Sequence, residues 1–274
     1  MTLLTQKMDF AIIAAGEGSR LVQEGVKTPK PLITIHGSSL VERLIRIFLN
    51  NGATSISVIV NEEMKEVQDF LKKIRLPVPF HLHIRSTPSS MHSFYELNRY
   101  LQNDRFCLTT VDTIFREEEF RGYIQAFKNF DKLDGLMAVT SFVDDETPLY
   151  VKTDGEMRIL GFDNLPLHPL RRGTKHSYPP SQDSNSPFEG GREMSGRQNS
   201  YSLVSGGMYC LRRSAIAVLE NAIADGMSRM RNYQQRLVEE GLYLKAYPFS
   251  KIIDVDHADD IRKAEEFLDG KTIW

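Results

Sequence analysis

Short apolar runs alternate with amphipathic segments through the first half of the chain. Uninterrupted apolar runs predict buried strands at 9–15, 54–60, 80–85 and 106–111. Apolar residues at helical spacing predict helices at about 38–51, 62–73, 89–102 and 113–130. We therefore expect an α/β protein, with a Rossmann-like, mostly parallel mixed sheet and helices on both of its faces.

The ends of these segments carry polar residues that fit their predicted positions. Ser38 or Ser39 is expected to cap helix 38–51, and Gly52 is expected to end it. The loop at 14–20 and Asp112 each follow a predicted strand. Ligands of open α/β sheets bind at the carboxyl ends of the strands. The loop and Asp112 should therefore share one edge of the sheet.

The pattern changes after about residue 134. Three segments, LDGLMAVTSF, LYVKTDG and MRILGFD, predict antiparallel strands with a turn at Asp154-Gly155. The remaining predicted elements are a strand at 202–211, helices at 213–225 and 227–240, a strand at 242–247 and a helix at 258–268.

Residues 164–200 interrupt this order. The segment is rich in Pro, Gly, Ser and Arg and has no apolar period, which is typical of a mobile insertion or a lid. Because a strand of the same kind resumes at 202, we interpret the segment as an insertion within a single domain that covers 1–274.

Charge and composition narrow the partners. With 34 basic and 36 acidic side chains the net charge is -2, so we expect neither nucleic-acid nor membrane binding. The two cysteines, Cys107 and Cys210, lie in strand-like runs and indicate no disulfide framework. The chain has no apolar run of about 18 residues and no apolar leader at its start, so a cytoplasmic location is expected.

A glycine-containing loop follows the first predicted strand, in 11-AIIAAGEGSRLVQEGVKTPKPLITI-35. Gly16 and Gly18 suit a turn whose backbone N–H groups converge on an oxyanion. A tight strand-to-helix turn without a ligand explains two glycines equally well.

The residues after the glycines are more informative. A Rossmann dinucleotide loop needs a small residue where Leu21 stands, and a P-loop needs the full pattern Gly-x-x-x-x-Gly-Lys-Ser/Thr, which occurs nowhere in the sequence. Arg20 offers a forked donor for a polyphosphate. Lys30 lies between Pro29 and Pro31, which stiffen its backbone. These cations favour a triphosphate as the ligand.

Four segments resemble the nucleotidyltransferase family, whose members join a nucleoside triphosphate to a sugar 1-phosphate or related phosphate and release pyrophosphate. The first is Gly16–Arg20 followed by Pro29–Leu32, and the others are 105–115, 202–211 and 252–267, in the family's order. The resemblance covers most of the chain except 164–200. It implies the nucleotide-diphospho-sugar transferase type of fold, with a nucleotide-binding half at about 1–130 and an acceptor-binding half at about 131–274.

The resemblance also implies roles for individual residues. Arg20 would hold the β and γ phosphates, and Lys30 would neutralise charge on the α phosphate. Gly206 and Gly207 would let the acceptor approach strand 202–211, although paired glycines also indicate a β-bulge. The residues implied to bind the nucleotide are Ala14, Ala15, Gly16, Gly18 and Ser19, with Ser89 and Ser90 beside the base.

The resemblance implies Mg²⁺ as cofactor, with Asp112 and Asp256 as its ligands; Mg²⁺ prefers one or two carboxylates with phosphates and waters. Asp112 could instead cap the helix predicted at 113–130. Asp254 alternates with Asp256 along an extended segment, so only one of them should face the site, and we favour Asp256. His257 follows it where the family usually has Thr.

Two further aspartates need no role in catalysis, and the reaction itself needs no catalytic base. Asp259 and Asp260 lie in the first turn of a predicted helix, where its dipole explains them. An acceptor phosphate has a second pKa of about 6 and is already ionised at neutral pH, so the reaction needs no general base.

Three alternatives stay open from the sequence. The acceptor could be phosphocholine, another alcohol phosphate or a pterin cofactor precursor. Asp254-Val255-Asp256 also spells the Asp-x-Asp of glycosyltransferases. A nucleotide-sugar binder without turnover is the third. These patterns do not determine the nucleobase. They are compatible with an oligomer but do not determine the oligomeric state.

Overall fold

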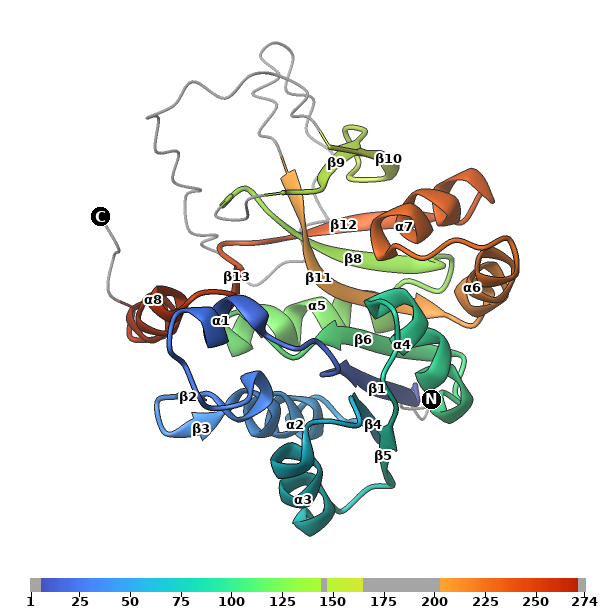
Figure 1. Cartoon of the computed structure of the whole chain (residues 1–274). Helices are drawn as coiled ribbons and strands as arrows, with labels where there is room; N and C mark the ends of the chain where they lie inside the picture. The colour runs from blue at the N-terminus through green and yellow to red at the C-terminus, as the bar shows by residue number, and fades with distance from the viewer. Residues whose placement is uncertain (1–5, 144–146, 165–202, 271–274) are drawn as a thin grey trace.

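The computed structural model describes residues 6–143, 147–164 and 203–270 (Figure 1). Within them, nine strands form one sheet, and the strands of the first half are parallel, in the order β5–β4–β1–β6. Their bounds are Met8–Ile13 for β1, Ser55–Val60 for β4, Phe80–Ile84 for β5 and Arg105–Thr110 for β6. The predicted strands of this half are confirmed.

The second half adds antiparallel strands around β11. This strand pairs antiparallel with β6, β8 and β9, while β12 runs parallel to β8. Asp154 Oδ1 accepts from the N–H groups of Glu156 and Arg158 in the turn of the β9–β10 hairpin, as predicted. The bounds are Gly135–Thr140 for β8, Tyr150–Thr153 for β9, Ile159–Asp163 for β10, Leu203–Arg212 for β11 and Leu244–Phe249 for β12, which begins two residues later than predicted.

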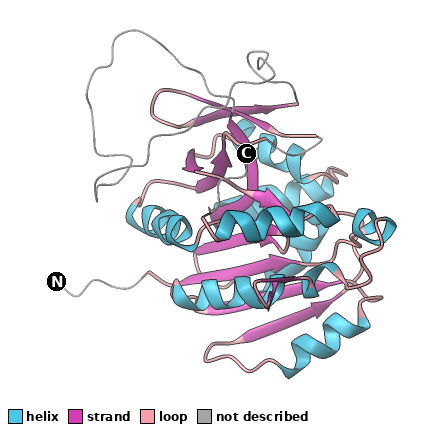
Figure 2. Ribbon diagram, turned by 90° about the vertical axis from the view of Figure 1, so that its left-hand side faces the viewer, coloured by secondary structure: helices cyan, strands magenta, loops and turns pink. Residues whose placement is uncertain are grey.

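Helices cover both faces of the sheet (Figures 1 and 2). The side chains of β1 alternate between the two cores: Phe10 and Ile12 pack on one face, Ala11 and Ile13 on the other. On the first face lie α2 (Leu40–Asn50), α3 (Lys65–Lys73), α5 (Glu117–Asn129) and α8 (Ala258–Leu268). On the second lie α4 (Ser90–Leu97), α6 (Ser214–Ala224) and α7 (Met230–Glu239). The predicted α/β class, with a Rossmann-like, mostly parallel mixed sheet and helices on both faces, is confirmed.

Some boundaries differ from the prediction. Helix α4 ends at Leu97 and passes into a 3-10 turn, η2 (Asn98–Tyr100), instead of continuing to 102. The segment 164–200 lies, except for Asn164, outside the described residues. The shorter elements are α1 (Ser19–Gln23), η1 (Lys30–Leu32), β2 (Thr34–Ile35), β3 (Ser38–Ser39), β7 (Thr113–Ile114) and β13 (Ile253–Asp254).

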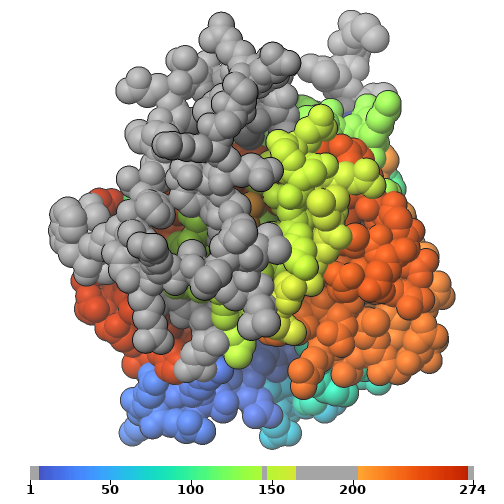
Figure 3. Space-filling view, turned by 90° about the horizontal axis from the view of Figure 1, so that it is seen from above, coloured from blue at the N-terminus to red at the C-terminus, as the bar shows by residue number. Residues whose placement is uncertain are grey.

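The β9–β10 hairpin packs beside α7. Figure 3 shows its yellow-green surface next to the orange surface of the two helices that follow β11. The backbone N–H of Phe162 in the hairpin donates to Gln235 Oε1 of α7 at 3.0 Å. Across the described ranges, no helix is both long enough and apolar enough to cross a membrane.

Ser39 caps α2 through a reciprocal arrangement with Glu42. Ser39 Oγ accepts from the Glu42 N–H at 3.4 Å, and Glu42 Oε2 accepts from the Ser39 N–H at 3.2 Å. Ser39→Ala should therefore lower the free energy of unfolding by about 1 kcal/mol, measured by urea denaturation. Ser228→Ala, at an exposed position outside the helices, is the control and should change it little. An equal loss in both variants would contradict the role of the cap.

Candidate active site

The glycine-containing loop follows β1 at the carboxyl edge of the parallel strands and lines a cavity of about 600 Å³. Gly18 has φ of 64°, a left-handed conformation that favours glycine, and a Cβ there would lie 3.2 Å from Lys30 Cβ. Gly16 is different, because a Cβ there would meet no described atom within 4 Å. The surrounding protein therefore explains the glycine at 18 and leaves space open at 16.

Other predicted residues of the loop lie at the same place. Ala15, Ser19 and Arg20 line the cavity. Ala14 is buried directly after β1 and donates its N–H to Ile59 O at 2.9 Å. This hydrogen bond fixes the start of the loop to β4.

Asn61 is a residue of this cavity that sequence reasoning missed. It follows β4 directly, is buried, and donates from Nδ2 to Ala15 O at 3.2 Å. Its Oδ1 accepts from the N–H groups of Glu63 and Met64. One side chain thus joins the loop after β1 to the loop after β4. A polar residue at the end of a buried strand was the available signal.

Residues 86–90 and Ser93 form another part of the wall of the cavity. Ser89 caps α4 and shares a hydrogen bond with His92 Nδ1 at 2.9 Å. Thr87 Oγ1 shares one with Ser93 Oγ at 2.6 Å. The predicted pair Ser89 and Ser90 lines the cavity, so this wall is hydroxyl-rich and already ordered by its own hydrogen bonds.

Lys30 is buried, with 8% of its side chain exposed, between two carboxylates. Its Nζ lies 2.5 Å from Asp112 Oδ2 and 2.7 Å from Asp256 Oδ1. Burial alone would lower the pKa of Lys30, but the charges of Asp112 and Asp256 outweigh it and raise the pKa above its ordinary value. Lys30 is therefore a fixed positive charge at neutral pH.

Asp112 follows β6, as predicted, but it does not cap a helix. The chain continues into β7, and α5 begins only at Glu117, so the capping alternative is wrong. Burial opposes the charge of Asp112, yet Lys30 holds its pKa below the usual value. Its Oδ1 is buried and has no hydrogen-bond partner among the described residues.

A two-residue strand pairing brings the segment around Asp256 next to Asp112. Strand β13 pairs antiparallel with β7, and the Val255 N–H donates to Asp112 O at 3.1 Å. Asp256 follows and contacts both Lys30 and Arg20, the latter through Nη1 at 3.2 Å. Asp254 lines a neighbouring cavity, formed by β11 and α7, and does not line the cavity of the glycine-containing loop. The structure therefore brings Asp256, the favoured aspartate, to Lys30.

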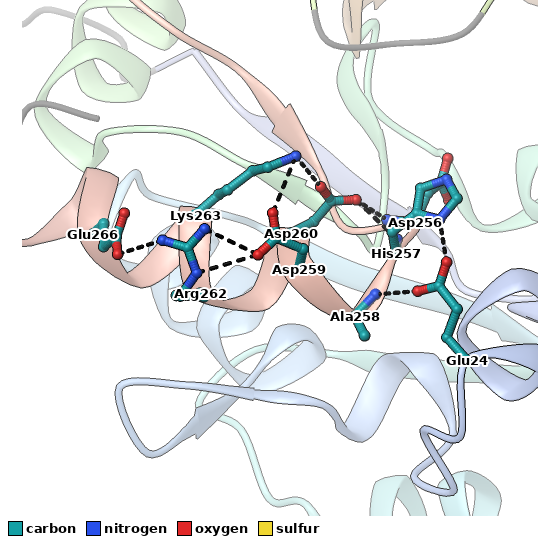
Figure 4. Close-up of polar contacts among 9 residues, drawn as sticks. All are labelled: Glu24, Asp256, His257, Ala258, Asp259, Asp260, Arg262, Lys263 and Glu266. Atoms are coloured by element: carbon teal, nitrogen blue, oxygen red, sulfur yellow. Dashed lines mark hydrogen bonds and ion pairs between the residues drawn. The ribbon is translucent and has the colours of Figure 1, made fainter. Parts of the chain in front are cut away.

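Two further carboxylates hold this segment, as Figure 4 shows. Asp260 is buried, and its Oδ2 accepts from the N–H groups of Asp256 and His257 at 3.1 and 2.8 Å. Glu24 accepts from the Ala258 N–H and from His257 Nδ1. Its hydrogen bonds to His257 and then Ala258 hold its pKa below the ordinary value. The helix dipole alone is thus an incomplete explanation for Asp260.

The two glycines predicted to meet the acceptor lie in different surroundings. The pairing of β11 with β8 shifts register between Ser205 and Tyr209, so the predicted β-bulge is present. Gly207 has φ of 70° and lines a second cavity of about 580 Å³. Gly206 packs closely, since a Cβ there would lie 2.2 Å from Ile252 Cδ1.

The second cavity adjoins the first. Both are lined by Ser89, Ser90, Thr110 and Asp112. Asp112 thus faces two spaces at once, one formed by the glycine-containing loop and one formed by β11 and α7. This arrangement suits two substrates, one in each cavity, that react with each other where the cavities meet at Asp112.

The carboxylates offer few protein ligands to a metal. Among the residues that the structure describes, no group of three or more His, Cys, Asp or Glu side chains could hold a metal ion. Asp112 and Asp256 form a pair instead. Mg²⁺ is commonly held by one or two carboxylates together with substrate phosphates and waters, so the pair fits it.

The MobA-like NTP transferase domain family matches residues 10–237, and the chain belongs to this family. The resemblance to nucleotidyltransferases is therefore confirmed, and the nucleotidyltransferase interpretation is favoured over a glycosyltransferase. The match includes the loop, Lys30 and Asp112, and it ends before β13 and Asp256.

Two curated proteins illustrate what the chain is similar to. The bifunctional protein GlmU of Thermodesulfovibrio yellowstonii is 24% identical over 97% of this chain and 53% of its own length, so the chain spans about half the length of that curated relative. A 2-aminoethylphosphonate cytidylyltransferase of Lancefieldella rimae is 38% identical over 55 residues, which are 20% of this chain and 22% of that protein.

Two solved structures have the same fold. A putative glucose-1-phosphate thymidylyltransferase from Bacillus anthracis superposes with a TM-score of 0.73 at 17% identity, over 97% of both chains. The inositol-1-phosphate CTP transferase from T. maritima gives 0.68 at 15% identity, over 98% of this chain and 99% of that one.

Proposed function

We propose that the protein transfers a nucleoside monophosphate from a nucleoside triphosphate to a sugar 1-phosphate or a similar phosphate, and releases pyrophosphate. The observation that carries this proposal is the position of Asp112, which lines both cavities while Lys30 joins it to Asp256. The first cavity would take the triphosphate, and the second would take the acceptor.

The chain's own residues would act by binding and by charge. The open space at Gly16 lets phosphate approach the backbone, and Arg20 is half exposed at the mouth of the cavity, where it can hold the terminal phosphates. Lys30 supplies a fixed positive charge where negative charge increases at the α phosphate. Because the acceptor phosphate is already ionised, no side chain needs to remove a proton.

Mg²⁺ is the cofactor that these residues fit best. Asp112 Oδ1 lacks a partner among the described residues; in Asp256, Lys30 contacts one oxygen and Arg20 the other, which becomes available when Arg20 turns to phosphate. Asp112 and Asp256 would hold the ion together with phosphate oxygens. When bound, it would neutralise phosphate charge and so make the approach of one anion to another less costly.

The second cavity supports a hydroxylated acceptor. Buried Gln234 accepts from Ser205 Oγ at 3.1 Å and donates to Tyr209 Oη at 3.3 Å, so the wall presents ordered hydroxyl groups. Arg229 and Arg231 also line it. Two guanidinium groups disfavour a quaternary ammonium group, which makes a sugar or polyol phosphate a better acceptor than phosphocholine.

A second candidate is transfer of CMP to a small phosphonate or alcohol phosphate. The local 38% identity to a 2-aminoethylphosphonate cytidylyltransferase favours it. The two candidates differ in the acceptor and share the chemistry at Lys30, Asp112 and Asp256.

Pyrophosphate release tests the proposal. The protein with Mg²⁺ is mixed with CTP, UTP, GTP, dTTP or ATP, each with glucose 1-phosphate, inositol 1-phosphate, phosphocholine or 2-aminoethylphosphonate. Release with a sugar or polyol phosphate is expected, and release with CTP and the phosphonate alone would support the second candidate. Absence of release with every pair, together with no nucleotide binding in calorimetry, would refute both.

A further inference from the structure

Glu24 connects two parts of the candidate site that are far apart in sequence. It directly follows α1, the short helix that carries Arg20. Its Oε2 accepts from the Ala258 N–H at 2.7 Å, and its Oε1 accepts from His257 Nδ1 at 2.6 Å. These donors belong to the first turn of α8 and to the residue before it, next to Asp256 (Figure 4).

Arg20 and Asp256 also contact each other directly, at 3.2 Å. In the proposed reaction both groups have other partners: Arg20 holds phosphate and Asp256 serves the metal. Their direct ion pair therefore competes with substrate binding. The contacts of Glu24 involve neither the Arg20 guanidinium nor the Asp256 carboxylate. They can therefore persist when substrate is bound.

Asp260 extends the connection to Asp256 itself. Its carboxylate holds the N–H groups of Asp256 and His257, and Lys263 Nζ lies 3.0 Å from its other oxygen. A fixed start of α8 therefore fixes the backbone of Asp256. Glu24 supplies the bond between that start and the helix that carries Arg20.

We propose that Glu24 is a positioning residue, which keeps Arg20 and Asp256 at a fixed spacing after substrate has separated their ion pair. This inference rests on the proposed function. It differs from a role in the fold alone, because the spacing matters only when phosphate and metal occupy the site. A misplacement of about 1 Å remote from the reacting atoms can reduce a rate about 100-fold.

The test compares Glu24→Ala with Glu119→Ala. Glu119 makes equivalent contacts to the same C-terminal segment, since its carboxylate accepts from Ser250 N at 2.7 Å and Ser250 Oγ at 3.0 Å, but it lines neither cavity. Glu24→Ala should lower kcat about 10- to 100-fold, leave KM for the acceptor within about 3-fold and raise the Mg²⁺ concentration for half-maximal rate. Glu119→Ala should lose similar thermal stability and keep kcat.

Hydrogen exchange gives a readout independent of turnover. With Mg²⁺ and the best nucleotide of the panel, peptides covering 254–262 should exchange faster in Glu24→Ala than in the parent or in Glu119→Ala. Glu24→Gln keeps an acceptor for the Ala258 N–H and should restore most of kcat.

Three results would overturn the inference. Equal loss of kcat in Glu24→Ala and Glu119→Ala would reduce Glu24 to a structural contact. Unchanged hydrogen exchange at 254–262 in Glu24→Ala would show that Glu24 does not position this segment. A kcat of Glu24→Gln as low as that of Glu24→Ala would indicate that the charge of Glu24 matters instead of its hydrogen bond. If the parent protein itself shows neither turnover nor nucleotide binding, the proposed function fails, and the inference fails with it.

Discussion

Lys30→Ala should lower kcat by about 10²- to 10³-fold, while the dissociation constant of the nucleotide rises only several-fold. Lys30 lies between Asp112 and Asp256, beneath the glycine-containing loop. Its charge would be most needed when negative charge increases on the α phosphate, whereas Arg20 and the loop backbone still bind the triphosphate. Pyrophosphate release gives kcat, and calorimetry with a nucleotide gives the dissociation constant.

The same substitution should also destabilise the protein. Removing one partner of a buried ion pair costs about 3–5 kcal/mol, and the low end of this range applies because Asp256 is 41% exposed. Lys245→Ala is the matched control, since Lys245 is also 8% exposed but lies in β12, outside both cavities. It should lose stability and keep turnover. Equal losses of kcat and nucleotide affinity in Lys30→Ala would place Lys30 in ground-state binding instead.

Asp112→Asn should lower kcat by about 10³-fold, which corresponds to the several kcal/mol that a metal ion contributes to such a reaction. The amide is nearly isosteric, but it loses the negative charge beside Lys30 and replaces one of the two carboxylate oxygens with an NH₂ group, which cannot bind a metal ion. Lys30 keeps Asp256 as a partner, so the fold should survive. The melting temperature of the parent should rise on addition of Mg²⁺ with nucleotide, and this rise should be mostly lost in the variant.

Asp134→Asn is the control for Asp112→Asn. Asp134 is a partly buried, hydrogen-bonded aspartate that accepts from Tyr243 N and Ser214 Oγ, and it lines neither cavity. Its variant should keep the Mg²⁺-dependent rise in melting temperature. An Asp112→Asn protein that also keeps this rise, and keeps turnover, would exclude Asp112 as a ligand.

Much of the fold could be predicted because local periodicity and burial agree. The strand around Phe10 and the helix capped by Ser39 each bury a face that the sequence pattern marks as apolar. Boundaries were less accurate where a short element intervenes. Thr113 and Ile114 look like the start of a helix, but they form a two-residue strand that pairs with Asp254 and Ile253, 141 and 139 positions later.

The candidate site was predictable only in part, for a similar reason. Arg20, Lys30, Asp112 and Asp256 have charges that stand out beside strands and glycines. Their mutual distances depend on long-range pairing, which no local pattern encodes. Asn61 and Glu24 were missed because they bind backbone groups of distant segments, and the contact of Asp260 with the backbone of Asp256 is local but was attributed to the helix dipole alone.

The pairing of β13 with β7 has a consequence for biosynthesis. Lys30 and Asp256 are 226 residues apart, so a ribosome working at about 5–20 residues per second needs about 10–45 seconds to add the second after the first. In the later part of this interval, after Asp112 and β6 have been added, the parallel strands of the first half can already assemble while the second carboxylate is not yet made. The emerging polypeptide would then acquire its complete charge arrangement only when the segment before α8 leaves the exit tunnel, and translational pausing between the codons for Asp112 and Asp256 would prolong the inactive interval.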